Sequence, residues 1–266
     1  MTIRVCLAGA TGWAGSELAR GIAASRDLEL VSAISRSHAG KRLGDVLGIA
    51  GLGAPIFATA KEALASGCDV FVEYTKPDSA KGHVLAALGA GASVVVATSG
   101  LSDADYAEVD AASKKAGRGV LACGNFALTV VLMQKFAEAA AKVLPQWEII
   151  DYAHDDKPDS PSGTARELAF RLSKVRAPAP TIPVESTRGV KEARGGNVAG
   201  TQVHSLRLPG YLLSTEIVFG LPDQRLGIRH DTGTSSRPYV DGALLAIRKV
   251  SGLRGLHRGL DTVLDL

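Results

Sequence analysis

The chain opens with Ile3-Arg4-Val5-Cys6-Leu7-Ala8, a short apolar strand, which runs directly into Gly9-Ala10-Thr11-Gly12-Trp13-Ala14-Gly15. The residues from 16 to 24 then have the spacing of an amphipathic helix. A strand, a glycine-rich turn and a helix in this order form the phosphate cradle of a dinucleotide-binding fold. The helix face predicted to pack inward carries Leu18, Ile22 and Ala23.

The three glycines of this turn have separate expected roles. Gly9 permits the tight turn, Gly12 lets the backbone approach a pyrophosphate, and Gly15 allows the helix to pack closely on the strand. Their spacing is G-x-x-G-x-x-G rather than the commoner G-x-G-x-x-G. Their position between a strand and a helix at the chain start favours a nucleotide site.

The end of the second predicted strand, residues 28–34, bears on cofactor choice. In folds that bind NAD, an acidic residue there bonds the ribose 2′-hydroxyl. This strand ends instead at Ser35-Arg36-Ser37-His38, and Glu29 lies at its start. Arg36 can make charge-assisted bonds to a 2′-phosphate. We therefore expect NADPH as the cofactor, with NADH as a second candidate; the alternative is a solvated loop with an incidental arginine.

Strands and helices alternate through the rest of the N-terminal half. Such βαβ repetition predicts a Rossmann-like, doubly wound parallel sheet with ligands at the carboxyl ends of its strands. His83 lies on a predicted helix and is expected at the surface. The predicted strands cover 69–74, 93–97 and 119–122, and the predicted helices cover 79–90 and 103–116.

The second half of the chain predicts a smaller α+β domain with an open mixed sheet. Three strands separated by Pro/Gly turns are expected over 202–208, 212–220 and 224–230. A long amphipathic helix over 129–144 precedes them. Its inward residues are predicted to be Val130, Met133, Phe136, Ala137, Ala140 and Val143.

We expect the final helix, 239–250, to return to the first domain. The predicted dinucleotide-binding domain is therefore 1–126 with 237–266, and the predicted substrate-binding and oligomerisation domain is 127–236. The glycine-rich stretch 189–200 is either a mobile loop that closes over an acidic ligand or a disordered surface loop.

Composition excludes several classes of protein. With 266 residues and 46% hydrophobic content, the chain can bury a sizeable core. Its net charge of +3 and aromatic content of 5% argue against a nucleic-acid binder. No apolar run is long enough to span a bilayer, and a strand begins at once, which leaves no room for a signal peptide. Three scattered cysteines, without metal-type spacing, indicate a soluble, reduced, cytoplasmic enzyme that has no metal site.

The second half also carries His154-Asp155-Asp156-Lys157-Pro158-Asp159-Ser160-Pro161-Ser162-Gly163-Thr164-Ala165, between the apolar run 148–150 and a predicted helix over 163–174. A strand, a loop and a helix in this order place polar groups at a helix N-terminus, where free N–H groups and the dipole attract anions. The segment therefore indicates a site for a small acidic molecule. An ordinary loop with a capped helix is the alternative.

This loop resembles the substrate loop of dihydrodipicolinate reductases, written E-x-H-H-x-x-K-x-D-x-P-S-G-T-A. Asp151, His154, Lys157, Asp159 and 161–165 fit that pattern, whereas its first histidine falls on Ala153. The family assigns that histidine the role of proton donor. The resemblance covers nearly the whole chain. It implies a homotetramer that reduces a cyclic, dicarboxylated imine-type intermediate of lysine and diaminopimelate synthesis.

The resemblance also implies a set of cofactor-binding residues at strand ends. Three turns, at 74–76, 97–99 and 123–126, are similar to the family's F-T-R-P, G-T-T-G and A-N-F segments. Ala97 replaces a glycine, Lys76 replaces an arginine, and Trp13 stands where the family commonly has arginine. The implied residues are Gly9, Ala10, Thr11, Gly12, Trp13, Ala14, Ser35, Arg36, Tyr74, Thr75, Ala97, Thr98, Ser99, Cys123, Gly124, Asn125 and Phe126.

By the same resemblance, Lys157 binds a substrate carboxylate and is a candidate proton donor. Ser162, Gly163 and Thr164 bind a carboxylate through backbone N–H groups and hydroxyls. His154 matches the family's second, substrate-contacting histidine. Three roles stay open for it: proton transfer, which its near-neutral pKa suits; substrate binding alone, with water as the proton source; or a simple salt bridge to a neighbouring aspartate.

Asp155 and Asp156 add negative charge where a dianionic substrate is expected. At ~5 Å and an effective dielectric near 20, each unit of repulsion costs roughly 3 kcal/mol. Either these carboxylates point to water, or the substrate differs and carries an amine.

The hypotheses are therefore an authentic dihydrodipicolinate reductase, a relative that reduces another imine or keto acid, and a non-catalytic NADPH-binding regulator. The opening segment, residues 9–18, is also similar to N-acetyl-glutamyl-phosphate reductases, which need a nucleophilic cysteine. Cys123 is the candidate, but its neighbours do not match that family's motif.

Overall fold

A computed structural model of the chain describes residues 2–264. It divides into two compact units, one running up to Leu128 and resuming at Ser236, the other covering Thr129–Ser235. Among the described residues, no helix combines the length and the apolar character needed to cross a membrane.

The first unit is built on a seven-stranded, fully parallel sheet with the order β12-β6-β5-β4-β1-β2-β3. The chain proceeds outward from β1 to β3, then restarts beside β1 at β4 and proceeds the other way. This reversal is the topological switch point at which doubly wound sheets bind ligands, and it confirms the predicted Rossmann-like fold. The strands are β1 Ile3–Ala8, β2 Leu28–Ile34, β3 Ile56–Phe57, β4 Val70–Glu73, β5 Ser93–Val96, β6 Gly119–Ala122 and β12 Gly255–Arg258.

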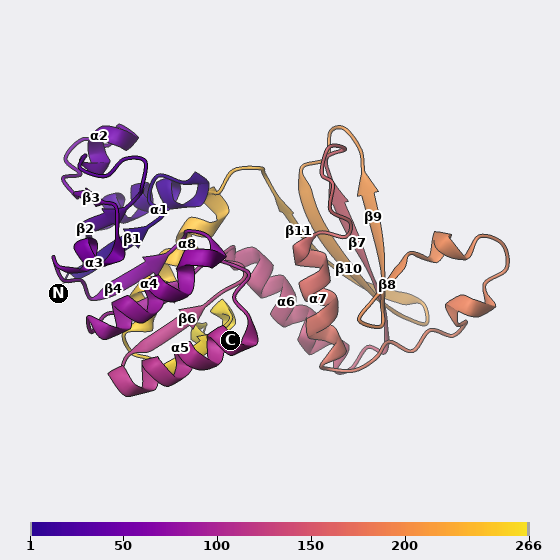
Figure 1. The fold of residues 1–266 in the computed structure, drawn as a ribbon. Coiled ribbons are helices and arrows are strands. Elements are labelled where there is room, and N and C mark those ends of the chain that lie inside the picture. Colours follow the sequence, from indigo (N-terminus) through magenta and orange to yellow (C-terminus); the bar gives the residue numbers. More distant parts are fainter. Residues whose placement is uncertain (1, 265–266) are drawn as a thin grey trace. The chain divides into compact units, whose positions relative to one another are not determined.

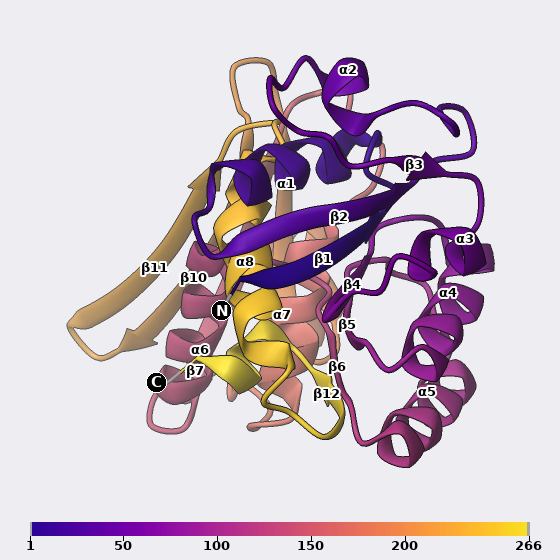
Figure 2. The ribbon, with the colours of Figure 1, turned by 90° about the vertical axis from the view of Figure 1, so that its left-hand side faces the viewer.

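Helices cover both faces of this sheet, with α1 and α8 on one face and α3, α4 and α5 on the other (Figure 2). The central strands are mostly apolar because both of their faces are buried; Glu73 at the end of β4 is a buried exception. Leu7, Phe71 and Leu121 are among the largest fully buried side chains. The helices are α1 Trp13–Ala24, α2 Leu43–Leu47, α3 Ala60–Leu64, α4 Pro77–Gly89, α5 Asp103–Ala116 and α8 Val240–Val250, with 3₁₀ turns η3 Arg237–Tyr239 and η4 Leu260–Val263.

The C-terminal segment completes this unit. A Cβ atom added to Gly242 in α8 would lie 1.9 Å from the carbonyl oxygen of Phe126, so the helix packs directly on the backbone that follows β6. After α8, the strand β12 pairs in parallel with β6. The sequence interpretation did not include β12, because four residues with two polar side chains give no clear strand pattern.

The second unit carries a five-stranded mixed sheet with the order β11-β10-β7-β9-β8. Only β7 and β9 pair in parallel; the other neighbours are antiparallel. The helices α6 and α7 lie along the same face of this sheet (Figure 1). The open mixed sheet confirms the prediction. The elements are α6 Leu128–Ala141, β7 Gln146–Ala153, α7 Gly163–Ser173, η1 Val184–Ser186, η2 Lys191–Arg194, β8 Gly196–Val198, β9 Thr201–Arg207, β10 Leu213–Leu221 and β11 Gln224–Thr232.

Some side chains predicted to lie inward are exposed. In α1, Ala23 is exposed and Ala19 is buried, because the buried stripe follows i, i+3 and i+4 from Gly15. In α6, Phe136 lies off the stripe and is 52% exposed. Val143 is 73% exposed because the helix ends at Ala141.

The glycine-rich stretch 189–200 contains regular structure, which contradicts the disordered surface loop; its closure over an acidic ligand stays a prediction. It contains the 3₁₀ turn η2 and the edge strand β8, which pairs with β9. Gly195 has a φ of +80°, and a Cβ atom there would lie 2.7 Å from the carbonyl oxygen of Val203. The glycine therefore permits a close approach of two backbones.

Candidate active site

The glycine turn after β1 is tightly packed against its neighbours. Gly9 has a φ of +78°, and a Cβ atom there would lie 2.3 Å from the carbonyl oxygen of Tyr74. A Cβ atom at Gly15 would lie 2.1 Å from the carbonyl oxygen of Gly9. Both positions therefore require glycine.

Gly12 is the N-cap of α1, which begins at Trp13 rather than at residue 16 as predicted. No side chain caps this helix. Its first backbone N–H groups, including that of Ala14, are therefore available to an anion, and the helix dipole favours one. A bare glycine turn at a helix N-terminus fits the pyrophosphate of a dinucleotide.

The residues expected around the adenosine ribose lie together. The hydroxyl groups of Thr11 and Ser35 are 2.8 Å apart, which links the turn after β1 to the end of β2. Arg36 follows with an exposed side chain, and His38 lies within 2.9 Å of the Ser37 hydroxyl. Glu29 is the second residue of β2, at the opposite end of the strand.

The other predicted cofactor residues follow β4, β5 and β6, so they share one edge of the parallel sheet. The rings of Tyr74 and Phe126 are 6.0 Å apart, and burial raises the pKa of the Tyr74 phenol. The side chain of Asn125 accepts a hydrogen bond from the N–H of Ala127 at 2.8 Å, which holds the turn after β6. The remaining members are Thr75, Ala97, Thr98, Ser99, Cys123 and Gly124, together with Ala10 in the turn after β1; Ala10, Thr98 and Cys123 are buried.

Trp13 is held by the returning C-terminal segment. Its backbone carbonyl accepts a hydrogen bond from the Ser236 hydroxyl at 2.8 Å. Its indole is 62% exposed and meets the Tyr239 ring edge-on at 6.0 Å. Sequence reasoning missed Ser236 and Tyr239, since more than 220 residues separate them from the turn.

Two further residues near this edge were not recognised as site residues. Glu73, the last residue of β4, is fully buried, although it ends an otherwise apolar strand. His83 was expected at the surface, but its side chain is only 20% exposed and its Nδ1 lies 2.7 Å from Oε2 of Glu73. The sequence did contain a signal for this pair, because Glu73 places a carboxylate in an apolar strand where burial is expected.

In the second unit, β7 extends through Ala153, whose side chain is fully buried. The strand alternates between buried and partly exposed residues, and position 153 falls on the buried side. His154 therefore begins the loop with an imidazole that is 34% exposed. It bonds Asp156, and this hydrogen bond lowers the pKa of Asp156. Asp155 and Asp156 are both exposed, so the two carboxylates are solvated.

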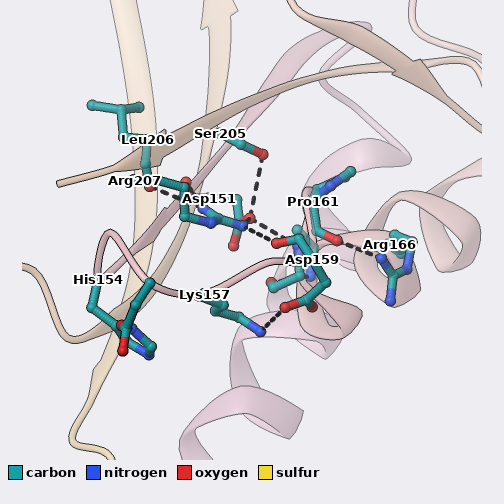
Figure 3. Close-up of polar contacts among 12 residues, drawn as sticks. Asp151, His154, Lys157, Asp159, Pro161, Arg166, Ser205, Leu206 and Arg207 are labelled. Atoms are coloured by element: carbon teal, nitrogen blue, oxygen red, sulfur yellow. Dashed lines mark hydrogen bonds and ion pairs between the residues drawn. The ribbon is translucent and has the colours of Figure 1, made fainter.

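The Lys157 side chain is largely buried, with 21% exposure, and its Nζ contacts Oδ1 of Asp159 (Figure 3). This hydrogen bond lowers the pKa of Asp159. The pair keeps an ammonium group at a defined place in the loop, where it can neutralise a carboxylate.

The N-terminus of α7 closes the loop. Ser162 is its N-cap, and its hydroxyl accepts a hydrogen bond from the N–H of Ala165 at 3.3 Å. The N–H of Ser162 donates to Asp151 at 2.8 Å. The N–H groups of Gly163 and Thr164, in the first turn of the helix, remain the donors suited to an anion.

A buried ion pair between Asp151 and Arg207 supports the loop 154–162. Asp151 is 1% exposed, and its carboxylate accepts hydrogen bonds from Ser205 at 3.3 Å and Arg207 at 2.7 Å (Figure 3). Arg207 also donates to the carbonyl oxygen of Asp159 at 2.7 Å. Both ends of the loop are thereby tied to β9. Sequence reasoning missed Arg207, because nothing in the local pattern pairs it with a residue 56 positions earlier.

A Rossmann-like unit with a nucleotide turn, joined to a mixed-sheet unit whose polar loop ends at a helix N-terminus, defines a two-domain oxidoreductase that uses a nicotinamide cofactor. Residues 3–126 match the family model "Dihydrodipicolinate reductase, N-terminus", and residues 129–264 match "Dihydrodipicolinate reductase, C-terminus". The chain belongs to the dihydrodipicolinate reductase family, as the loop predicted.

Individual relatives agree over the full length. The chain is 38% identical to the 4-hydroxy-tetrahydrodipicolinate reductase of Desulfitobacterium hafniense (strain DSM 10664 / DCB-2), with 99% of each chain covered. It is 36% identical to that of Halalkalibacterium halodurans, covering 99% of this chain and 100% of the relative. The solved dipicolinate-bound dihydrodipicolinate reductase from Paenisporosarcina sp. TG-14 superposes with a TM-score of 0.88 at 30% identity, over 99% and 100% of the two chains.

Proposed function

We propose that this protein reduces 4-hydroxy-tetrahydrodipicolinate to tetrahydrodipicolinate in lysine and diaminopimelate biosynthesis, with loss of water. The observation that carries the proposal is the substrate loop. Lys157 and the N-terminus of α7 supply a cation and free N–H groups for a dicarboxylate. Full-length similarity to reductases of that name supports the same conclusion.

The cofactor is NADPH, and NADH is the second candidate. Trp13 and Ala14 offer backbone N–H groups to the pyrophosphate, while Ser35 and Arg36 meet the 2′-phosphate. The turns after β4, β5 and β6 surround the nicotinamide ribose and ring. When bound, the cofactor supplies the hydride. The absence of a carboxylate at the end of β2 favours the phosphorylated form.

The protein's own part is orientation, charge neutralisation and proton supply. Lys157 binds a substrate carboxylate and donates the proton, while Gly163 and Thr164 hold the second carboxylate through their N–H groups. Ser162 positions these groups as the helix cap. His154 contacts the substrate from the loop's exposed side, in hydrogen-bonded contact with Asp156. Ala153 supplies no proton.

The deciding experiment is NADPH oxidation, followed at 340 nm, with freshly made 4-hydroxy-tetrahydrodipicolinate. We expect turnover on the order of 10 per second. Intact NADPH binding without turnover of this compound would contradict the proposed substrate and favour another imine or amino-keto acid.

We further propose a cytoplasmic homotetramer. The mixed sheet has one face under α6 and α7, while β11 and nearby loops expose Leu208, Leu212 and Leu226. An uncovered sheet of this kind favours association with further copies. Sedimentation equilibrium distinguishes four copies of the 27.5 kDa chain from one. The cytoplasm is where charged nicotinamide cofactors and dicarboxylate intermediates are both retained.

A further inference from the structure

We infer that Glu73 is a positioning residue whose buried carboxylate holds two of the cofactor turns in place. This inference rests on the proposed function in one respect: it takes the turns at 74–76 and 97–99 as the nicotinamide-binding segments. Glu73 does not act on the cofactor itself, since its side chain is 0% exposed.

The carboxylate gathers donors from three separate segments. Oε1 accepts hydrogen bonds from the N–H of Thr75 at 2.7 Å, from the Thr75 hydroxyl, and from the Thr98 hydroxyl at 3.3 Å. Oε2 lies 2.7 Å from Nδ1 of His83, on α4. One side chain thus connects the turn after β4, the turn after β5 and the helix between these strands.

The backbone of the same residue extends this network. The carbonyl oxygen of Glu73 accepts a hydrogen bond from the N–H of Ala97 at 2.9 Å. The next residue, Tyr74, donates its N–H to Ala8 at 3.1 Å, and its carbonyl oxygen is the atom that excludes a side chain at Gly9. The glycine turn is therefore in contact with the segment that Glu73 holds.

A buried carboxylate is retained only where hydrogen bonds compensate for its lost hydration. An apolar residue would suit the end of strand Val70–Glu73 equally well for packing, since its other members are all buried and apolar. By accepting hydrogen bonds, the carboxylate fixes the positions of the Thr75 and Thr98 hydroxyls and of the Thr75 N–H. Groups fixed before binding lose less entropy when a ligand arrives, which raises affinity.

The test compares NADPH affinity among variants, measured by titration calorimetry without substrate. We expect Glu73→Leu to weaken NADPH binding by roughly tenfold or more, because it removes several charge-assisted hydrogen bonds. Glu73→Gln should stay within about threefold of the parent protein, since its carbonyl can face Thr75 and its amide can face an unprotonated His83 Nδ1. The matched control is Val72→Ala, which leaves a cavity in the same strand without touching the network.

Variants of His83 keep the inference testable if Glu73→Leu does not fold. His83→Asn retains a donor near the Nδ1 position and should bind NADPH as the parent protein does. His83→Leu removes the donor and should weaken binding several-fold. In steady-state assays the effect should fall on the KM for NADPH, with the KM for the imine substrate unchanged.

Two outcomes would overturn the inference. One is parent-like NADPH affinity in both Glu73→Leu and His83→Leu. The other is an equal loss of affinity in Val72→Ala, which would reduce Glu73 to a role in stability. Failure of the proposed function has a different signature, namely a parent protein that binds NADPH but does not turn over the imine.

Discussion

Lys157 contacts Asp159 within the substrate loop, and this pairing limits where its ammonium group can lie. A charged group held at one place can serve first as a carboxylate ligand and then as a proton source. The neighbouring position 153 is a buried alanine at the end of β7. At the residue scale, Lys157 is therefore our proposed proton donor, and His154 is a proposed substrate contact.

Replacing Lys157 by alanine should lower kcat/KM for the imine by about 10²–10⁴, the usual contribution of a positioned general acid. The NADPH dissociation constant should not change. Lys174→Ala is the matched control, because that lysine lies at the other end of α7, over the Phe170 ring. Equal activity of the two variants would exclude Lys157 from the chemistry.

Replacing Arg36 by alanine should raise the KM for NADPH by about tenfold, since a charge-assisted hydrogen bond is lost, and should leave the KM for NADH unchanged. Arg26→Ala is the control; this arginine is exposed and precedes the opposite end of β2. Initial-rate kinetics with both cofactors measures the ratio. A parallel change with NADPH and NADH would contradict recognition of the 2′-phosphate by Arg36.

At the scale of elements, the substrate loop depends on the strand beside it. Arg207 in β9 contacts the Asp151 carboxylate at one end of the loop and the Asp159 carbonyl at the other. The loop therefore takes its shape from β9 as well as from its own sequence.

Arg207→Leu should lower the free energy of unfolding by about 3–5 kcal/mol, because it leaves Asp151 buried without its cation. It should also raise the substrate KM. Denaturant titration measures the first effect. The double variant Asp151→Leu with Arg207→Leu should recover part of the lost stability, because no buried charge remains. The control is Arg166→Leu; this arginine is exposed, and its loss should cost about 1 kcal/mol or less. A single variant as stable as the parent protein would show that the pair does not support the loop.

The cap of α7 offers a finer test at the same scale. Ser162→Ala removes the hydroxyl that accepts from Ala165 and should cost about 1 kcal/mol of stability. Ser173→Ala, the same change at the last residue of that helix, should alter stability by less than about 0.5 kcal/mol. Thermal unfolding of both variants gives the comparison; equal shifts would argue against a capping role.

For the whole molecule, the cofactor residues belong to the first unit and the substrate loop to the second. Ligands should therefore protect different segments. NADPH at 100 times its dissociation constant should stabilise the protein by about 2.7 kcal/mol. In hydrogen exchange it should slow the amides of 9–15, 74–76 and 97–99, whereas dipicolinate should slow those of 154–165. Protection of 154–165 by NADPH alone, with none in the glycine turn, would contradict this assignment.

Much of this fold was predictable because its signals are local. The strand, turn and helix from Ile3 to Ala24 require an apolar run, glycines and helical spacing, all of which lie within one stretch of chain. The loop after β7 likewise carries Lys157, its cap Ser162 and Gly163 within one short stretch of chain. These features indicated the doubly wound sheet, the mixed sheet and the family.

Other features arise only when distant segments meet. Three contacts join residues that are far apart in the sequence: the Asp151–Arg207 pair, the Ser236 contact to Trp13 and the Glu73 contact to His83. The burial of Ala153 likewise depends on the segments that pack around it. Sequence by itself determined which groups are present and which elements carry them, because backbone preference and hydrophobic periodicity act over a few residues. Tertiary structure alone decided which polar groups are buried and paired, because desolvation depends on every segment that packs around them.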